Sequence, residues 1–162
     1  MSSEFDVSEF RHVVSHFATG VVVVCGNEEG ELVGFAAQSF VSLSLEPPLI
    51  LFCPQKTSTS WPRIRSLGKF CINVLAEDQG DVSDAFAMIG EVADIAWHRN
   101  PTSGTPALEG VIATIDCSLN AEHDAGDHTI VVADVQGLRV DRPELGPLLF
   151  FQGAYGHFAP AS

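Results

Sequence analysis

Short runs of alternating hydrophobic and polar residues cover much of the chain, and this two-residue period is typical of β-strands. In one run Val41, Leu43 and Leu45 alternate with serines, which predicts a strand with one buried face. Residues 71–76 give the same prediction. The strand candidates, all rich in β-branched residues, are residues 20–25, 33–37, 39–45, 49–53, 69–76, 111–119 and 128–135.

Three stretches have the spacing of short amphipathic helices. Residues 6–18 place Phe10, Val13 and Phe17 on one face, and Asp6 or Ser8 can cap the start. The other two helices are expected after the serine-rich residues 58–60, where Pro62 suits a first turn, and near residues 81–88. Residues 89–110 are polar and weakly patterned, so we expect little regular structure there.

Turn signals at residues 26–30, 46–48 and 124–127 separate the strand candidates. Many short strands at this density favour an antiparallel barrel or sandwich over alternating β-α-β units. The length of 162 residues and a hydrophobic fraction of 46% fit one globular domain over residues 1–162. We find no internal repeat and no boundary to a second domain.

The formal net charge of -13 excludes several partners, because its field repels nucleic-acid phosphates and anionic membranes. The chain starts without the basic and apolar segments of a secretory signal, and it has no apolar stretch of membrane-spanning length. A cytoplasmic protein is therefore expected. The four cysteines are far apart in the sequence and are interpreted as buried free thiols.

Several common catalytic motifs are missing from the sequence. There is no glycine-rich dinucleotide fingerprint, no P-loop and no serine-hydrolase elbow. His123, Asp124, Asp127 and His128 surround one turn but lack a recognised ligand spacing, so no metal site is predicted.

Six sequence blocks, taken in order, carry a resemblance to a known family. They are FATGVVVV (17–24), GFAAQSFVSLSLEPPLILFC (34–53), KFCINVLAEDQ (69–79), the pair Ala85-Phe86, AGDH (125–128) and PLLFFQGAYGHF (147–158). Their order and separations resemble the flavin reductase family, whose members supply reduced flavin to two-component monooxygenases. The resemblance implies a mainly β fold, an antiparallel split β-barrel of Greek-key type with a few short helices, assembled as a homodimer with flavin near the subunit interface.

The resemblance also implies an activity, which is the reduction of FMN or FAD by NADH or NADPH and delivery of the reduced flavin to a separate monooxygenase. Two alternatives stay open on the same fold. One is a flavin- or deazaflavin-binding protein with a different reductant or acceptor. The other is a flavin-binding module without catalytic activity.

The family's flavin-binding segments map onto the first half of the chain. The ring and its side chain would contact Phe35, Ala36, Ala37, Gln38, Ser39 and Ser42. Cys53, Pro54 and Gln55 would connect the ring to a phosphate site made by Lys56, Ser58, Thr59 and Ser60, where a helix N-terminus adds N–H donors. The same hydroxyls could instead simply cap the helix. This chain departs from the family pattern at Ala36, where Thr is commoner, and at Gln38, where Ser or Asn is commoner.

The later family blocks imply contacts to the nicotinamide side. His128, as a positioning catalytic residue, and Tyr155 are the main candidates, and glycines around Tyr155 would allow a folded dinucleotide to approach. An ordinary structural role for His128 and Tyr155 is the alternative. The remaining cofactor-binding candidates implied by the resemblance are Ala85, Phe86, Gly153, Ala154 and Gly156.

Overall fold

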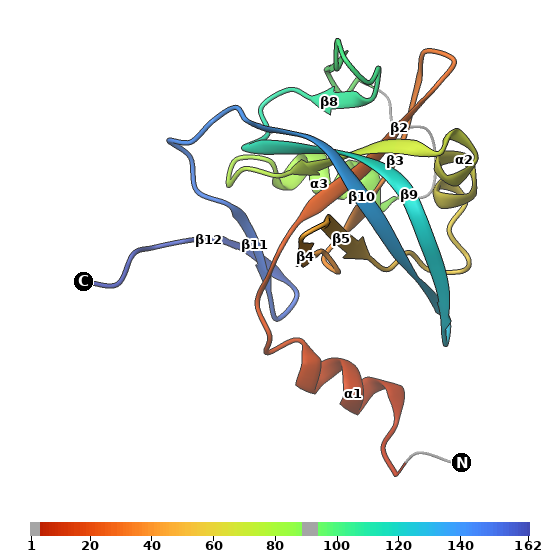
Figure 1. The fold of residues 1–162 in the computed structure, drawn as a ribbon. Helices are drawn as coiled ribbons and strands as arrows, with labels where there is room; N and C mark the ends of the chain where they lie inside the picture. The colour runs from red at the N-terminus through yellow and green to blue at the C-terminus, as the bar shows by residue number, and fades with distance from the viewer. Residues whose placement is uncertain (1–3, 89–93) are drawn as a thin grey trace.

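The computed structural model describes residues 4–88 and 94–162, and its described part is dominated by antiparallel sheets (Figure 1). The strands are β1 (Thr19–Gly20), β2 (Val22–Glu28), β3 (Glu31–Ala37), β4 (Val41–Leu45), β5 (Pro48–Phe52), β6 (Lys69–Val74), β7 (Trp97–Arg99), β8 (Pro106–Leu108), β9 (Ala113–Ala125), β10 (His128–Val140), β11 (Leu148–Phe151) and β12 (Ala154–His157). The helices are α1 (Val7–Val14), α2 (Ser60–Leu67) and α3 (Gly80–Ala87). The structure confirms the mainly β class and the antiparallel pairing.

One seven-stranded sheet organises the molecule, with the strand order β3-β2-β6-β9-β10-β5-β4. A three-stranded sheet (β1-β11-β12) and a two-stranded ribbon (β7-β8) accompany it. The two long strands β9 and β10 extend further than the sequence pattern indicates, because their hairpin pairs Ala125 with His128 across a tight turn at Gly126, whose φ is 64°.

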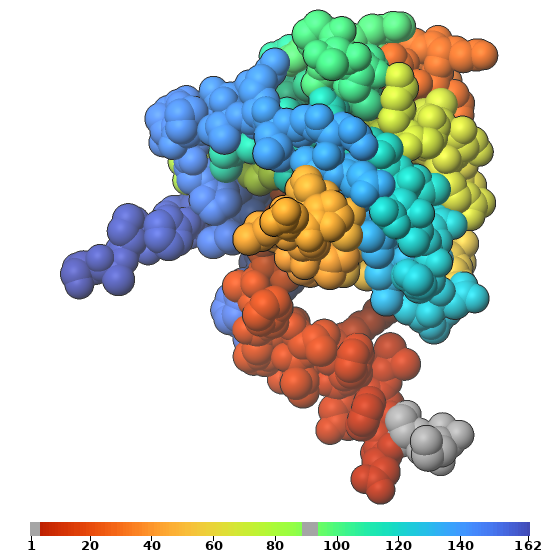
Figure 2. Space-filling view, viewed as in Figure 1, coloured from red at the N-terminus to blue at the C-terminus, as the bar shows by residue number. Residues whose placement is uncertain are grey.

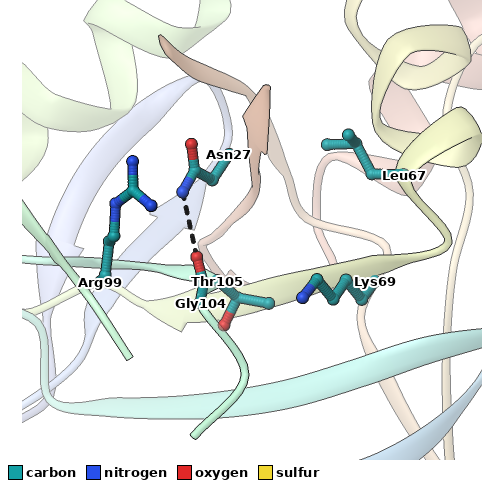
Figure 3. A pocket seen from close by; sticks show the side chains of 6 residues that line it. All are labelled: Asn27, Leu67, Lys69, Arg99, Gly104 and Thr105. Carbon is teal, nitrogen blue, oxygen red and sulfur yellow. Dashed lines mark hydrogen bonds between the residues drawn. The ribbon is translucent and has the colours of Figure 1, made fainter. Parts of the chain in front are cut away.

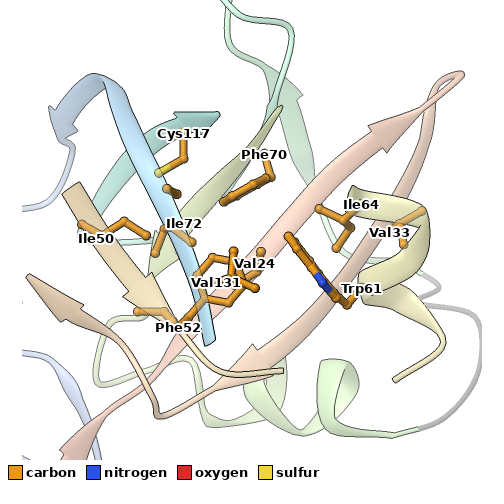
Figure 4. Close-up of a cluster of buried hydrophobic side chains, with 12 residues drawn as sticks. Val24, Val33, Ile50, Phe52, Trp61, Ile64, Phe70, Ile72, Cys117 and Val131 are labelled. Atoms are coloured by element: carbon orange, nitrogen blue, oxygen red, sulfur yellow. The ribbon is translucent and has the colours of Figure 1, made fainter. Parts of the chain in front are cut away.

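Each face of the large sheet packs against its own hydrophobic cluster. The first contains Phe52, Trp61, Phe70 and Val131, with α2 closing one end, and its aromatic rings meet edge to face at 5.3–5.6 Å (Figure 4). The second, under α3, β8 and β11, contains Val23, Leu75, Phe86, Leu108 and Leu148. Strand β6 is therefore buried on both faces, which corrects the prediction of one buried face for residues 71–76.

The side chain of Asn73, near the end of β6, ties the ribbon to the sheet. It is fully buried, and its Oδ1 accepts from the Leu108 N–H at 2.8 Å while its Nδ2 donates to the Pro106 carbonyl at 3.3 Å. This pairing satisfies polar groups that would be costly to bury alone. The ribbon β7-β8 also corrects the expectation of little regular structure in residues 89–110, of which residues 89–93 lie outside the described part.

Helix α1 ends earlier than predicted and buries none of its residues. Asp6 caps it by accepting from the Glu9 N–H at 2.8 Å, as the sequence predicts. The apolar face is open, with Phe10 54% and Val13 63% exposed, and Figure 2 shows this segment projecting from the body of the molecule. In the single chain the expected burial of Val41, Leu43 and Leu45 on β4 is also wrong, since all three are exposed.

No helix in residues 4–88 and 94–162 is long and apolar enough to cross a membrane. A cytoplasmic location stays a prediction.

Candidate functional site

A groove of about 750 Å³ lies where β3, the loop before α2, helix α3 and the C-terminal hairpin meet. This volume is in the range of pockets that hold drug-sized ligands and cofactors. Fourteen of the residues expected at a cofactor site line it: Phe35, Ala36, Ala37, Gln38, Ser39, Cys53, Pro54, Gln55, Ser58, Thr59, Ser60, Phe86, His128 and Tyr155. Segments more than one hundred residues apart in the sequence therefore share one concave surface.

Six of the expected residues do not line the groove: Ser42, Lys56, Ala85, Gly153, Ala154 and Gly156. Lys56 instead pairs with Asp124 at 3.4 Å, and Ser42 lies on β4 opposite Ile50. The sequence interpretation missed Val21, Gly34, Thr57, Ser83, Asp84, Ala87, Met88 and Phe150. Gly34 stands in a quoted family block, and the spacing of α3 could have indicated Ser83.

Gly34 sets how closely α3 approaches β3. A Cβ added at Gly34 would lie 2.8 Å from Cε1 of Phe86 and 2.9 Å from the Val24 carbonyl oxygen, closer than real Cβ contacts. Phe86, which is 4% exposed, therefore packs directly on strand backbone. The adjacent Ala36 and Ala37 keep the strand side of the groove shallow, so a flat ring can lie near the backbone.

The loop into α2 supplies a concentration of hydroxyl groups. Ser58 Oγ accepts from the Trp61 N–H at 3.1 Å and so caps the helix, while Thr59, at the N-cap position, makes no side-chain cap bond. Ser60 also has no hydrogen bond to its side chain among the described residues, so these two hydroxyls remain available to a ligand. Trp61 anchors the helix start because its Nε1 donates to Glu122 at 2.9 Å.

His128 lies beside this loop. The Lys56 N–H donates to the Asp127 carbonyl and the Thr129 N–H to the Pro54 carbonyl, at 2.9 and 3.0 Å, which fixes the two segments together. Nδ1 of His128 lies 2.7 Å from a carboxylate oxygen of Asp127. Since an ionised carboxylate only accepts, Nδ1 is the donor in this contact, and Nε2 makes no hydrogen bond to the described residues. The same hydrogen bond is the main cause that lowers the pKa of Asp127 below its usual range.

Tyr155 occupies a different wall of the groove, against α3. Its hydroxyl donates to Asp84 Oδ1 at 2.6 Å and lies 2.9 Å from Ser83 Oγ, which can donate in return. Partial burial first, and then the hydrogen bond to Asp84, raise the pKa of Tyr155 above its ordinary value. The structure thus brings His128 and Tyr155 into one groove, though not onto the same wall.

The groove contains one thiol, Cys53, whose backbone N–H donates to Ser39 Oγ at 2.9 Å. Burial raises the pKa of this thiol, and the hydrogen bond from Ser39 partly opposes that effect. A raised pKa keeps Cys53 protonated near neutral pH and unreactive as a nucleophile. Among the described residues no cluster of three or more His, Cys, Asp or Glu side chains could hold a metal ion.

Comparison with known proteins gives a consistent set of relatives. Residues 14–159 match the family described as Flavin reductase like domain. The reductase subunit HsaB of a flavin-dependent monooxygenase from Mycobacterium tuberculosis is 45% identical over 99% of this chain and 87% of that protein. The FMN reductase (NADH) SmoA of Agrobacterium fabrum is 39% identical over 93% of this chain and 85% of its own length.

The solved structure of the NADH:FAD oxidoreductase SgcE6 from Streptomyces globisporus C-1027, in complex with NAD and FAD fragments, is also similar. It superposes with a TM-score of 0.90 at 32% identity, and the match covers 99% of this chain and 97% of that one.

Tyr155 is the only tyrosine of the sequence, so its contact with Asp84 of α3 can be measured by ultraviolet titration of tyrosinate absorbance. We expect a midpoint above about 10, the usual tyrosine pKa. Asp84→Asn should lower that midpoint, because it removes a negative charge that disfavours tyrosinate, while Asp81→Asn on the exposed side of α3 should leave it unchanged. A midpoint that does not respond to Asp84→Asn would contradict the contact.

Proposed function

Since this chain belongs to the flavin reductase family, we propose that it transfers hydride from a nicotinamide dinucleotide to a flavin in the groove and passes the reduced flavin to a separate monooxygenase. The observation that carries this proposal is the groove itself, which joins a shallow strand wall to a hydroxyl-rich helix start. Its residues fit an FMN or the FMN portion of FAD, with the ring along residues 35–39 and the phosphate at Thr59 and Ser60. We also propose that the large sheet is the family's split barrel.

The chain's residues act in this proposal by positioning and by excluding water. The bound flavin accepts the hydride that the nicotinamide supplies, so no side chain has to transfer a proton in that step. Residues that hold two rings about 3–3.5 Å apart supply most of the effect. His128, oriented by Asp127, offers Nε2 as a hydrogen-bonding partner for a carboxamide group, and Tyr155 forms another wall of the groove.

We further propose that NADH is preferred over NADPH. The described lining of the groove contains no Lys or Arg and includes one carboxylate, Asp84. A 2′-phosphate is usually recognised by a cation, and here it would face that carboxylate instead. SmoA, whose name specifies NADH, supports the same assignment.

A homodimer is proposed from the exposed apolar surface of the single chain. Phe10, Val13 and Phe17 on and after α1 are 54–78% exposed, and Leu45 at the edge strand β4 is 89% exposed. Large exposed apolar side chains on a helix face and an edge strand are typical of interaction sites in globular proteins. A second copy of the chain would cover it and protect the edge of the sheet.

The activity is tested by adding NADH under anaerobic conditions to protein loaded with FMN or FAD. Rapid loss of the flavin absorbance band is expected, and binding without reduction would favour one of the alternative functions.

His128→Ala should slow hydride transfer or raise the KM for NADH roughly two- to tenfold, the effect of a lost hydrogen bond worth about 0.5–1.5 kcal/mol. His123→Ala, on the neighbouring strand and outside the groove, is the matched control, and equal behaviour of both variants would assign His128 a structural role.

The double variant Thr59→Ala, Ser60→Ala should weaken FMN binding roughly 5- to 160-fold, because it removes two hydrogen bonds to phosphate, each worth about 0.5–1.5 kcal/mol. Riboflavin, which has no phosphate, should bind nearly as well as before. Ser66→Ala near the other end of α2 serves as the control. Similar losses for FMN and riboflavin in titrations would show that the helix start does not recognise phosphate.

Asp84→Asn should raise kcat/KM for NADPH about two- to tenfold relative to NADH, since one charge near the 2′-phosphate is worth on the order of 1 kcal/mol in a solvated site. Steady-state kinetics with both nucleotides measure this ratio, and Asp81→Asn provides the comparison. A wild-type preference for NADPH would contradict the proposal that Asp84 disfavours the 2′-phosphate.

Light scattering of the 162-residue chain should give about twice its mass of 17.3 kDa. Val13→Glu should shift the equilibrium towards monomer, because it places a charge in the apolar face of α1. Glu9→Gln on the same helix should not. A monomeric wild-type protein with undiminished flavin affinity would remove the basis for the dimer.

A further inference from the structure

A second, smaller pocket of about 170 Å³ lies away from the flavin groove. It is lined by Asn27, Leu67, Lys69, Arg99, Gly104 and Thr105, none of which lines the groove (Figure 3). The pocket forms where the loop between β7 and β8 folds over the ends of β2, β6 and α2. Three parts of the chain that are distant in sequence therefore contribute to it.

The basic residues of this pocket differ from most others in the chain. All eight Lys and Arg residues lie in the described part, and five of them form an ion pair with a carboxylate within 4.0 Å: Lys56, Arg63, Arg65, Arg139 and Arg142. Arg11, Lys69 and Arg99 have no such partner among residues 4–88 and 94–162. In a chain with 21 acidic residues, two of these three cations line the same small pocket.

The walls of the pocket are held by hydrogen bonds within the protein. Asn27 Nδ2 donates to the Gly104 carbonyl at 3.2 Å, and its Oδ1 accepts from the Gly30 N–H at 2.8 Å. Thr105 donates its hydroxyl to Asp116 behind the wall. The second carboxylate oxygen of Asp116 accepts from Asn100, so this buried acid is already satisfied by neutral donors. A ligand would therefore meet a fixed wall rather than compete for its polar groups.

The cations keep most of their donors free. Lys69 Nζ donates to the Ser103 carbonyl at 2.6 Å, which leaves two of its three N–H groups. The guanidinium of Arg99 makes no hydrogen bond to the described residues, and it lies close to Gly30, where an added Cβ would be 3.6 Å from Nη2. Figure 3 shows Lys69 and Arg99 on either side of the Gly104-Thr105 segment, with Leu67 forming an apolar wall.

We propose that this pocket binds a small oxyanion, either inorganic phosphate or the carboxylate of a short organic acid. Its volume is about that of five or six water molecules in the liquid. This space suits one phosphate or carboxylate group and is too small for a nucleotide. The planar fork of Arg99 matches two oxygens of an oxyanion, and Lys69 adds a second charge-assisted donor.

The test uses the 162-residue chain saturated with FMN, so that the phosphate position in the groove is filled. Phosphate is titrated at constant ionic strength, and backbone amide shifts are followed by two-dimensional NMR. We expect saturable shifts at Gly104 and Thr105. Lys69→Gln and Arg99→Gln should each weaken binding about tenfold or more, because each removes a hydrogen bond from a charged group. Lys69→Arg retains the charge and should preserve binding. This variant keeps the proposal testable even if the glutamine variants do not fold.

Arg11→Gln is the matched control, since it removes an equally unpaired cation elsewhere. A second titration with acetate separates the two ligand sources, because a carboxylate site responds to acetate at least as well as to phosphate. Non-saturating shifts, or equal responses in all variants, would overturn the proposal. Shifts confined to residues 58–60 would also overturn it, by showing that phosphate binds only in the groove. None of these readouts depends on flavin reduction, so the proposal can fail independently of the proposed activity.

Discussion

Burial of β2 and β6 on both faces is the constraint on which the rest of the structure depends. A central strand without a solvent face must be covered twice, and the chain covers it with α2 on one side and with α3, β8 and β11 on the other. Every buried polar group between these layers then needs a partner, and Asn73 provides one for the ribbon. The groove proposed to bind flavin is found where α3 and the loop before α2 leave part of β3 uncovered.

This construction explains why the site relies on neutral groups. Strand backbone, small side chains and hydroxyls form most of the groove, and the nearby cation Lys56 is occupied by Asp124. Contacts within the protein already position both helices, since Trp61 and Glu122 hold α2 and Phe86 and Tyr155 hold α3. Preorganised contacts of this kind lower the entropy cost of aligning two flat rings.

The sequence predicted what depends on local pattern and missed what depends on packing. The helix cap at Asp6 and most strand positions follow from local periodicity. The resemblance of the sequence blocks identified most groove residues, but Ser83 and Asp84 lie outside those blocks and enter the groove only through the docking of α3. The alternation on β4 correctly indicated a strand, yet no pattern within one chain can state whether its apolar face meets the chain's own core or another surface.

The absence of a side chain at position 34 has a consequence for the size of the groove. Phe86 rests on bare strand backbone there, so the spacing between α3 and β3 is fixed by one missing methyl group. A mutation to alanine would press the added Cβ against Phe86 and the Val24 carbonyl oxygen, so α3 would have to move outward and the groove beside the strand would widen. One substitution in the scaffold would thus change the size of ring system that the groove accepts, at a position separate from the proposed phosphate site.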